Sequence, residues 1–488
     1  MNLGKILDNV DILDIYGDID IDIKSVEFDS RKVKNDGLFI CVNGANVNGH
    51  MFINKAIDNG AKAFLISEDV HMVEGYTFIK VKDIKKSMAK IASNFYNNPS
   101  ENLDIIGVTG TNGKTSITTF LSQILNIDHK CGVIGTIKIY DGIYEIPSQN
   151  TTPESLDLQK SLYNMSKNKC EYCSMEVSSH SLALNRIDGV DIKIGIFTNL
   201  TEDHLDFHKN LDEYRNVKEQ LFYKTSKANI INIDDESGRI ILNHIKDLNT
   251  PYYTYGIERD ADFMAKNIEM DSNGIYYTLV TPTYEAKIRV PVPGKFTVYN
   301  TLSVIGACYV LNIPIETIKK GLENSEGIEG RFELVKNDKE YNIIVDYAHT
   351  PDALKNILSA VKEFSKGKII TVFGCGGDRD KQKRPIMGKI VQENSDVAII
   401  TSDNPRTENP KEIINDILHG INNKINNYIV IEDRKKAIEK AINIAKKNDI
   451  VLIAGKGHET YQIIGKVKYD FDDREIAKKF IDTININN

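Results

Sequence analysis

The residues best suited to chemistry lie between positions 103 and 116, where the sequence reads LDIIGVTGTNGKTS. An apolar run ends in a glycine-rich turn, and the turn ends in Gly113-Lys114-Thr115 before a segment with the apolar spacing of a helix. Backbone N–H groups and a helix N-terminus bind phosphate, Lys114 adds a positive charge, and Thr115 can hold Mg²⁺. The nearest upstream glycine is Gly107, so this loop is one residue longer than the usual pattern. It predicts binding of a nucleoside triphosphate.

Two further polar clusters follow predicted strands near this loop. Glu176 ends an apolar strand over 173–177, and the segment 198–208, TNLTEDHLDFH, follows a strand over 192–197. Carboxylate oxygens and imidazole beside a phosphate loop are suited to holding the Mg²⁺ of a triphosphate. The pattern therefore predicts Glu176 and His204 as metal ligands, and the alternative is that these side chains are solvated turn residues.

Three more polar clusters follow apolar strands in the last third of the chain. They read DYAHTPD over 346–352, GCGGDRD over 374–380 and SDNPR over 402–406. The planar guanidinium groups of Arg379 and Arg406 suit bidentate binding of a carboxylate. The alternatives are that the first cluster only caps a helix and that the arginines pair with neighbouring acids.

The elements that must position these clusters are those of a three-domain α/β protein. Residues 1–100 alternate short strands with helices and end at a polar breaker, NNPS. Residues 101–329 carry the phosphate loop, several strand candidates and a β-rich region over 252–293 that predicts a small added sheet or hairpin. Residues 330–488 alternate strands with amphipathic helices, which predicts a doubly wound parallel sheet with ligands beyond the carboxyl ends of its strands.

Composition is that of a soluble globular protein. The 488 residues are 41% hydrophobic and 27% charged, and the net charge of −8 disfavours general binding of nucleic acid or a membrane surface. The sequence shows neither a signal peptide nor a membrane span, so we expect a cytoplasmic protein. Cys170 and Cys173 form a lone CxxC, for which structural thiols are favoured over redox chemistry or half a zinc site.

Taken together, these clusters resemble the Mur ligases of peptidoglycan synthesis. The segments TGTNGKTS, MEVSSH, NLTEDHLDFH, DYAHTPDAL, GCGGDRD, DNPR and AGKGHE occur in the order of the members that add the third residue of the peptide. The family's phosphate loop has the same extra residue. The resemblance implies an N-terminal UDP-sugar-binding domain over 1–100, a central P-loop ATPase-like domain over 101–329 and a C-terminal Rossmann-like amino-acid-binding domain over 330–488.

The resemblance also implies four groups of site residues. The ATP-binding group is Gly110, Thr111, Asn112, Gly113, Lys114, Thr115, Ser116, Asn300, Arg331 and Asp346. The UDP-sugar-binding group is Ser30, Ala45, Asn46, Val47, Asn150, Thr151, Thr152, Ser178 and Arg186. The diaminopimelate-binding group is Arg379, Asp403, Asn404, Pro405, Arg406, Gly455 and Glu459. The metal-binding group is Thr115, Glu176, His204 and, if carbamylated, Lys218, and the implied catalytic residues are Lys114, Lys218 and His204.

The activity implied by the resemblance is an ADP-forming amide ligation. The D-glutamate carboxylate of UDP-MurNAc-L-Ala-D-Glu would be activated by ATP and Mg²⁺ as an acyl phosphate and joined to meso-diaminopimelate, and we expect a monomer. The DNPR segment is typical of the diaminopimelate-adding members, because Arg406 can bind the distal carboxylate that lysine lacks. A lysine-adding Mur ligase, a folylpolyglutamate synthetase-like ligase and a non-catalytic P-loop nucleotide switch remain alternatives.

Overall fold

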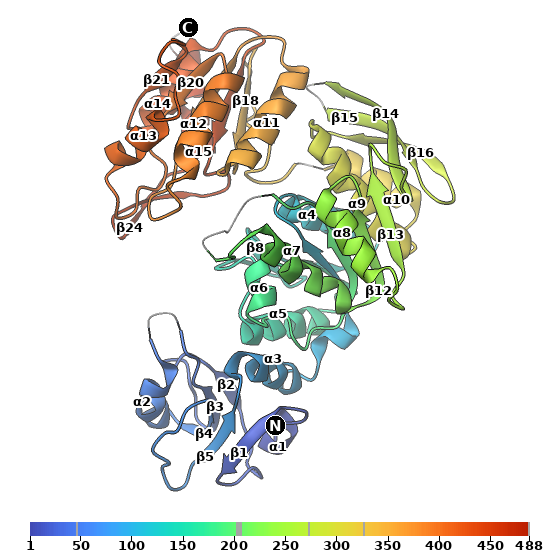
Figure 1. Cartoon of the computed structure of the whole chain (residues 1–488), viewed down its shortest axis with the longest axis vertical. Helices are drawn as coiled ribbons and strands as arrows, with labels where there is room; N and C mark the ends of the chain where they lie inside the picture. The colour runs from blue at the N-terminus through green and yellow to red at the C-terminus, as the bar shows by residue number, and fades with distance from the viewer. Residues whose placement is uncertain (45–46, 202–206, 272–273, 326, 487–488) are drawn as a thin grey trace.

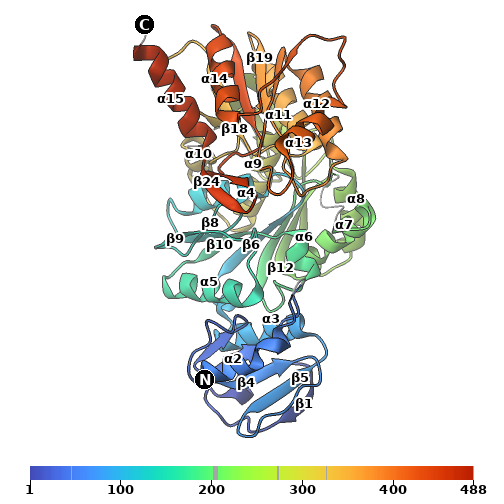
Figure 2. The same ribbon diagram turned by 90° about the vertical axis from the view of Figure 1, so that its left-hand side faces the viewer.

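The computed structural model describes residues 1–44, 47–201, 207–271, 274–325 and 327–486. Three α/β domains follow one another along the long axis of the molecule (Figure 1). They are built on a five-stranded, an eleven-stranded and a six-stranded sheet. The predicted three-domain α/β class is therefore confirmed. Each domain combines helices and strands, and the view in Figure 2 shows the N-terminal domain at the opposite end of the central domain from the C-terminal one.

The N-terminal sheet has the order β1-β5-β4-β3-β2, in which only β1 is antiparallel to its neighbour. Its strands are β1 (Ile12–Tyr16), β2 (Ser25–Glu27), β3 (Gly37–Ile40), β4 (Ala61–Ile66) and β5 (Thr77–Val81). Its helices are α1 (Leu3–Ile6), α2 (Ile53–Asp58) and α3 (Ile84–Phe95), with a 3₁₀ turn at Gly49–Phe52. Asp83 begins α3 by accepting hydrogen bonds from the backbone N–H groups of Lys85 and Lys86.

The central sheet has the order β16-β15-β14-β13-β12-β11-β6-β10-β7-β8-β9. Its strands are β6 (Asp104–Thr109), β7 (Cys131–Ile134), β8 (Lys138–Tyr140), β9 (Glu145–Pro147), β10 (Tyr172–Glu176), β11 (Ile192–Phe197), β12 (Thr225–Asn232), β13 (Tyr252–Gly256), β14 (Phe263–Asp271), β15 (Gly274–Val280) and β16 (Glu285–Val290). The β-rich region predicted over 252–293 forms β13 to β16. It extends the central sheet rather than standing apart, because β13 pairs with β12 in parallel.

Helices cover both faces of the central sheet. They are α4 (Lys114–Leu125), α5 (Ser155–Lys167), α6 (Ser179–Ala183), α7 (Leu211–Glu219), α8 (Glu236–Ile245), α9 (Lys295–Val310) and α10 (Ile315–Glu323), with 3₁₀ turns at Pro99–Asn102 and Gln220–Tyr223. Ile106 and Ile105, adjacent in β6, pack into different core clusters, as expected where successive side chains of a strand point to opposite faces.

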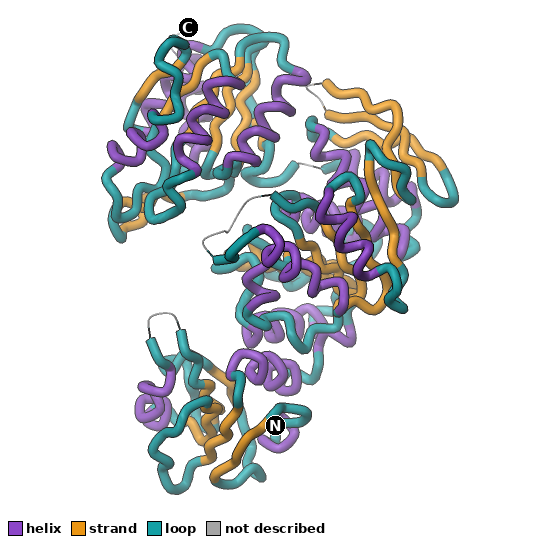
Figure 3. Tube along the Cα trace, viewed as in Figure 1, coloured by secondary structure: helices purple, strands orange, loops and turns teal. Residues whose placement is uncertain are grey.

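The C-terminal sheet has the order β17-β18-β22-β19-β20-β21, with only β17 antiparallel. Its strands are β17 (Glu333–Leu334), β18 (Asn342–Asp346), β19 (Ile369–Phe373), β20 (Val397–Ile400), β21 (Tyr428–Val430) and β22 (Ile450–Ala454), and β23 (Tyr461–Ile464) with β24 (Val467–Asp470) forms a separate hairpin. The helices are α11 (Pro351–Phe364), α12 (Lys383–Asn394), α13 (Pro410–Leu418), α14 (Arg434–Ile444) and α15 (Asp473–Ile486). Helices pack on both faces, so the predicted doubly wound sheet is confirmed (Figure 3).

An aromatic row fixes the C-terminal domain against the central one. Phe332 lies in the segment that connects the central sheet to the C-terminal one. The centroid of its ring is 6.0 Å from that of Phe296 in α9 and 5.9 Å from that of Phe364 in α11. The apolar core continues through this row, from Ile106 in β6 to Ile344 in β18. The sheet edges that carry the predicted site residues are therefore held at a defined separation.

Two remaining sequence expectations concern membrane spans and thiols. Within the described ranges, no helix has the length and apolar character needed to cross a membrane. Cys170 and Cys173 are both buried and free, and burial raises the pKa of each thiol above its ordinary value. A thiol with a raised pKa is a poor nucleophile and metal ligand, which agrees with the structural interpretation.

Candidate active site

The phosphate loop connects β6 to α4, and two of its glycines are required by its shape. Gly110 has φ +143° and Gly113 has φ +89°, both in the region that favours glycine. A Cβ atom on Gly110 would lie 1.8 Å from Thr198 Oγ1, and one on Gly113 would lie 2.6 Å from Asn300 Oδ1. The loop therefore packs against Thr198, which follows β11, on one side and against the predicted ATP-site residue Asn300 on the other.

Side chains after β11 hold the phosphate loop in place. The backbone oxygen of Asn199 accepts from Thr111 N at 2.8 Å, and its Oδ1 accepts from Asn112 N at 3.0 Å. Thr198 Oγ1 donates to the backbone oxygen of Asn112 at 2.7 Å. The sequence pattern does not single out Asn199, although the residue lies in the polar segment 198–208.

Two lysine ammonium groups meet at one carbonyl of the loop. Lys114 Nζ donates to the backbone oxygens of Gly110 at 2.9 Å and Thr111 at 2.7 Å, and Lys218 Nζ also donates to Gly110 O at 2.9 Å. Lys218 projects from α7, is 1% exposed and lies 4.5 Å from the centre of the Tyr214 ring. The sequence pattern around Lys218 is that of a solvated helix residue, but the fold buries the side chain against the loop. Two positive charges here favour an anionic ligand.

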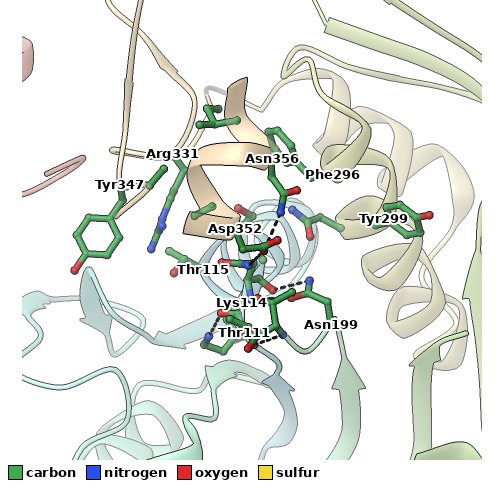
Figure 4. Close-up of a pocket in the computed structure, with 18 of the residues that line it drawn as sticks. Thr111, Lys114, Thr115, Asn199, Phe296, Tyr299, Arg331, Tyr347, Asp352 and Asn356 are labelled. Atoms are coloured by element: carbon green, nitrogen blue, oxygen red, sulfur yellow. Dashed lines mark hydrogen bonds between the residues drawn. The ribbon is translucent and has the colours of Figure 1, made fainter. Parts of the chain in front are cut away.

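The loop forms the floor of a cavity of about 750 Å³ between the central and C-terminal domains (Figure 4). The cavity is lined by the loop residues from Thr111 to Ser116 together with Thr151, Glu176, Ser178, Lys218, Asn300, Arg331 and Asp346. Across it, Asn112 Nδ2 donates to Asp352 Oδ2 of α11 at 3.0 Å. The structure thus brings together nearly all of the predicted ATP-site residues and part of the predicted UDP-sugar group.

Arg331 and Asp346 belong to the segment that enters the C-terminal domain. The Arg331 guanidinium lies 4.5 Å from the centre of the Tyr347 ring. Asp346 accepts from Phe332 N at 2.7 Å and Ala348 N at 2.8 Å. Burial raises the pKa of Asp346, whereas the nearby Arg331 charge lowers it. Asp346 therefore fixes the backbone next to Arg331, whose side chain lines the cavity.

Glu176 is the described residue best suited to hold a cation in this cavity. Its side chain is 1% exposed, and its two oxygens accept from Thr136 N at 2.8 Å and from Thr136 Oγ1 at 3.0 Å. Its side-chain partners in the described part of the chain are these two groups of Thr136, neither of them cationic. Among the described residues, no three or more histidine, cysteine or acidic side chains form a metal-binding group. A buried carboxylate without a cationic partner fits a metal ion. The predicted ligand His204 lies outside the described residues.

The predicted UDP-sugar group is divided between two domains. Thr152 Oγ1 donates to the backbone oxygen of Glu176 at 2.7 Å and accepts from Ser178 N at 3.1 Å, while Arg186 Nη1 donates to Thr152 O at 3.0 Å. Asn150 and Thr151 precede this cluster in sequence, and Thr151 Oγ1 contacts Thr136 Oγ1 at 3.0 Å. Ser30 and Val47 lie in the N-terminal domain and do not line the cavity, and Ala45 and Asn46 lie outside the described residues.

The predicted diaminopimelate residues gather at the carboxyl ends of β20 and β22. Asn404 Nδ2 donates to Glu459 Oε2 at 2.8 Å, and Asn404 Oδ1 accepts from Ile463 N at 2.9 Å. Gly455 has φ +119°, and a Cβ there would lie 2.7 Å from Asp403 Oδ2. The turn from Asp403 through Pro405 therefore packs closely on the turn after β22, while Arg379 lies on the facing loop after β19.

The β23–β24 hairpin sets the backbone of Arg406. Arg406 N donates to Ile463 O at 3.1 Å, and Arg406 O accepts from Gly465 N at 2.7 Å. The residue has φ +51°, a left-handed conformation that costs free energy in a non-glycine residue. Its Nη1 donates to Gly377 O at 2.8 Å. Sequence reasoning did not identify this hairpin, which holds the arginine in a strained and well-defined position.

Glu408 connects the two arginine-bearing loops. Arg384, which is 0% exposed, donates to both oxygens of Glu408 at 2.8 and 3.0 Å, and Glu408 in turn accepts from Asp378 N at 2.5 Å. The hydrogen bonds from Arg384 hold the pKa of Glu408 at about 2, below its ordinary 4.5. Because the folded-state pKa is depressed, this stabilisation is complete above pH 4.5 and is lost as the pH falls toward 2.

Glu408→Gln should lower the free energy of unfolding by about 2 kcal/mol near neutral pH, since it removes a charged acceptor from a buried arginine. Urea unfolding of wild type and variant from about pH 7 to pH 3 measures the difference. It should shrink below pH 4.5, because the Glu408 carboxylate of the unfolded wild-type chain then becomes protonated while that of the folded protein stays ionised. A difference that stays constant over this range would show that the charge of Glu408 contributes nothing.

Three family models match the chain in sequence order. The model described as "Mur ligase family, catalytic domain" matches residues 22–96, "Mur ligase middle domain" matches 108–308, and "Mur ligase, glutamate ligase domain" matches 330–457. All three structural domains are therefore represented in the matches.

Whole-chain similarity is also high. The UDP-N-acetylmuramoyl-L-alanyl-D-glutamate--2,6-diaminopimelate ligase of Clostridioides difficile (strain 630) is 60% identical over 480 residues, which are 98% of this chain and 99% of the relative. A ligase of the same name from Alkaliphilus metalliredigens (strain QYMF) is 47% identical and covers 98% of both chains. A solved structure of a ligase with this name has a TM-score of 0.73 and 31% identity, and the match covers 99% of both chains.

Proposed function

Because this chain belongs to the Mur ligase family, we propose that it is an ATP-dependent amide ligase that joins 2,6-diaminopimelate to UDP-N-acetylmuramoyl-L-alanyl-D-glutamate. One observation in the structure carries the proposal. A phosphate loop with two lysines, a buried carboxylate and residues of the next domain line one cavity, which suits phosphoryl transfer between substrates held by different domains. We also propose that the enzyme acts in the cytoplasm, where ATP is available, and that it is a monomer, because the proposed site residues all belong to one chain.

The reaction must first activate a carboxylate, because its carbon is a poor electrophile. In the proposed sequence the D-glutamate carboxylate attacks the γ-phosphorus of ATP, and ADP leaves. The amine of diaminopimelate then attacks the acyl phosphate, loses a proton and displaces inorganic phosphate to form the amide. Lys114 lies where it can neutralise charge on the transferred group, and the loop N–H groups can bind the phosphates.

The residues of the cavity also fit a magnesium ion. Thr115, Glu176 and a carbamylated Lys218 would hold it, with His204 as a further proposed ligand. When bound, Mg²⁺ supplies charge neutralisation at the phosphates. Carbamylation matters because it converts the buried ammonium of Lys218 into an anion, and an ammonium has no lone pair to offer a metal.

The acceptor end of the proposed site lies in the C-terminal domain. Arg406 would bind the distal carboxylate of diaminopimelate with its two-pronged guanidinium, and Glu459 would accept from the distal ammonium. Lysine would leave Arg406 without this partner, which disfavours its binding.

Product analysis tests the proposed function. The purified protein is incubated with ATP, Mg²⁺, UDP-MurNAc-L-Ala-D-Glu and meso-diaminopimelate, and mass spectrometry should show one product formed by loss of one water, with one ADP per product. Each reaction lacking one component should give no product. Binding of ATP without product formation would indicate a nucleotide switch, and product formation only with a folate acceptor would indicate a folylpolyglutamate synthetase-like ligase.

Lys218 should be needed in its carbamylated form. We expect Lys218→Ala to lose about 100-fold or more of kcat, the size of effect seen when a group that supports a metal site is removed. Wild-type enzyme freed of CO₂ should lose activity and recover it with bicarbonate, whereas the variant should not respond. Activity that is independent of bicarbonate in the wild type would contradict the modification.

A further inference from the structure

A fully buried lysine, Lys456, lies beneath the proposed diaminopimelate site. It follows β22, its side chain is 0% exposed, and its Nζ donates to Glu459 Oε2 at 2.9 Å and to Asn404 Oδ1 at 3.2 Å. Both partners belong to the proposed acceptor site. Burial of an ammonium group is costly unless it is paired, so its placement under these two residues points to a specific role.

Lys456 belongs to a buried charge network, which we define as Asp403, Glu459, Asp473, Arg434 and Lys456. Arg434 Nε and Nη2 donate to the two oxygens of Asp473 at 2.8 and 2.7 Å, and its Nη1 lies 3.9 Å from Asp403 Oδ2. Arg434 and Asp473 are both 0% exposed. The network thus contains three carboxylates and two cations.

Arg406 brings one more cation to the edge of this network. Both Arg406 and the network carboxylates act on the nearby Tyr461. Burial raises the pKa of Tyr461, the charges of Glu459 and Asp403 raise it further, and the charge of Arg406 lowers it. With Arg406 included, the buried charge network and its edge hold three positive and three negative charges. Arg379 of the proposed acceptor group is exposed, so water and salt screen its charge. A distal end that carries both a carboxylate and an ammonium leaves this balance unchanged, whereas the distal end of lysine adds a positive charge.

We propose that Lys456 is a specificity-determining residue whose buried charge balances the acceptor site, so that the site accepts a zwitterionic distal end and disfavours a cationic one. This inference rests on the proposed function. Lys456 acts through its field and through the position of Glu459, and needs no contact with the acceptor. Removal of its charge leaves an excess of one carboxylate in a region with little water, and that excess favours lysine relative to diaminopimelate.

The test is the ratio of kcat/KM for meso-diaminopimelate to kcat/KM for lysine. Lys456→Met removes the charge and keeps a side chain of similar length, and we expect the ratio to fall about tenfold, as for one charge acting across several ångströms of protein interior. The KM for ATP should not change. Where turnover with lysine is too slow to measure, its inhibition constant against diaminopimelate addition gives the same comparison.

Lys468→Met is the matched control. Lys468 Nζ lies 4.1 Å from the centre of the Tyr461 ring, and Lys456 Nζ lies 5.5 Å from the same centre, but Lys468 is exposed. Water and salt screen an exposed charge, so this substitution should leave the ratio unchanged.

Three outcomes decide the matter. A lower ratio for Lys456→Met with an unchanged ratio for Lys468→Met supports the proposal. An equal loss with both acceptors would overturn it, because Lys456 would then only support the local structure. If the methionine variant does not fold, Lys456→Gln removes the charge while keeping a hydrogen-bond donor for Glu459, and the same fall in ratio is required. A wild-type protein that forms no product with diaminopimelate would instead refute the proposed function.

Discussion

Lys114→Ala should reduce turnover by about 1,000-fold or more while the protein stays folded. The side chain contributes a full charge at the mouth of the phosphate loop, and in the transition state that charge opposes the negative charge of the transferred phosphoryl group. Lys114 Nζ donates to the backbone oxygens of Gly110 and Thr111, and the residue is only half-buried, so we expect its truncation to remove little packing. Phosphate release with all substrates present, together with thermal unfolding, measures both effects.

Lys130→Ala is the matched control for this prediction. Lys130 is also half-buried and also donates to a backbone oxygen, that of Asn168 at 2.8 Å, but it lies beyond the C-terminal end of α4 rather than at the phosphate loop. Its removal should leave turnover nearly unchanged. A folded Lys114→Ala protein with near-normal phosphate release would exclude the proposed role of Lys114.

Arg406→Ala should raise the KM for diaminopimelate about 100-fold or more, with little change in the KM for ATP. The guanidinium is proposed to bind the distal carboxylate, and its truncation would leave that carboxylate without its partner. The cavity floor that carries the nucleotide groups lies in the central domain, whereas Arg406 is fixed by the β23–β24 hairpin, so the two KM values should separate.

Arg406→Lys sharpens this experiment because it keeps the charge and removes the planar fork. We expect an intermediate KM for diaminopimelate, since lysine cannot form the bidentate contact. Arg406 has a left-handed backbone, which is also strained for alanine. Thermal unfolding of each variant should therefore be measured alongside the kinetics, to show that the protein stays folded. Equal changes in the KM values for ATP and diaminopimelate would argue for a general structural effect instead of a carboxylate contact.

Local signals explain which elements the sequence could predict. Helix α11 begins at Pro351 with Thr350 as its cap, and both residue types mark a helix start in sequence. The phosphate loop was equally recognisable, since its glycines, lysine and flanking elements are consecutive. A site whose residues are consecutive in the sequence, with recognisable caps and spacing, can therefore be predicted without a structure.

Contacts between distant segments explain what the sequence could not predict. Lys218 has the pattern of a surface helix residue, and only the packing of α7 on the phosphate loop buries it. Thr136 carries no local signal for its two hydrogen bonds to Glu176, because these bonds join the turn after β7 to the last residue of β10. The strained backbone of Arg406 likewise depends on a hairpin that follows it by more than fifty residues.

The most direct test of the proposed function compares acceptors in a single assay. Phosphate release is measured with ATP, Mg²⁺ and UDP-MurNAc-L-Ala-D-Glu, using either meso-diaminopimelate or lysine at the same concentrations. The proposed site predicts rapid release with diaminopimelate and a kcat/KM for lysine lower by a factor of about 100 or more, because lysine leaves Arg406 unpaired. Equal or faster release with lysine would contradict the assignment of the acceptor site.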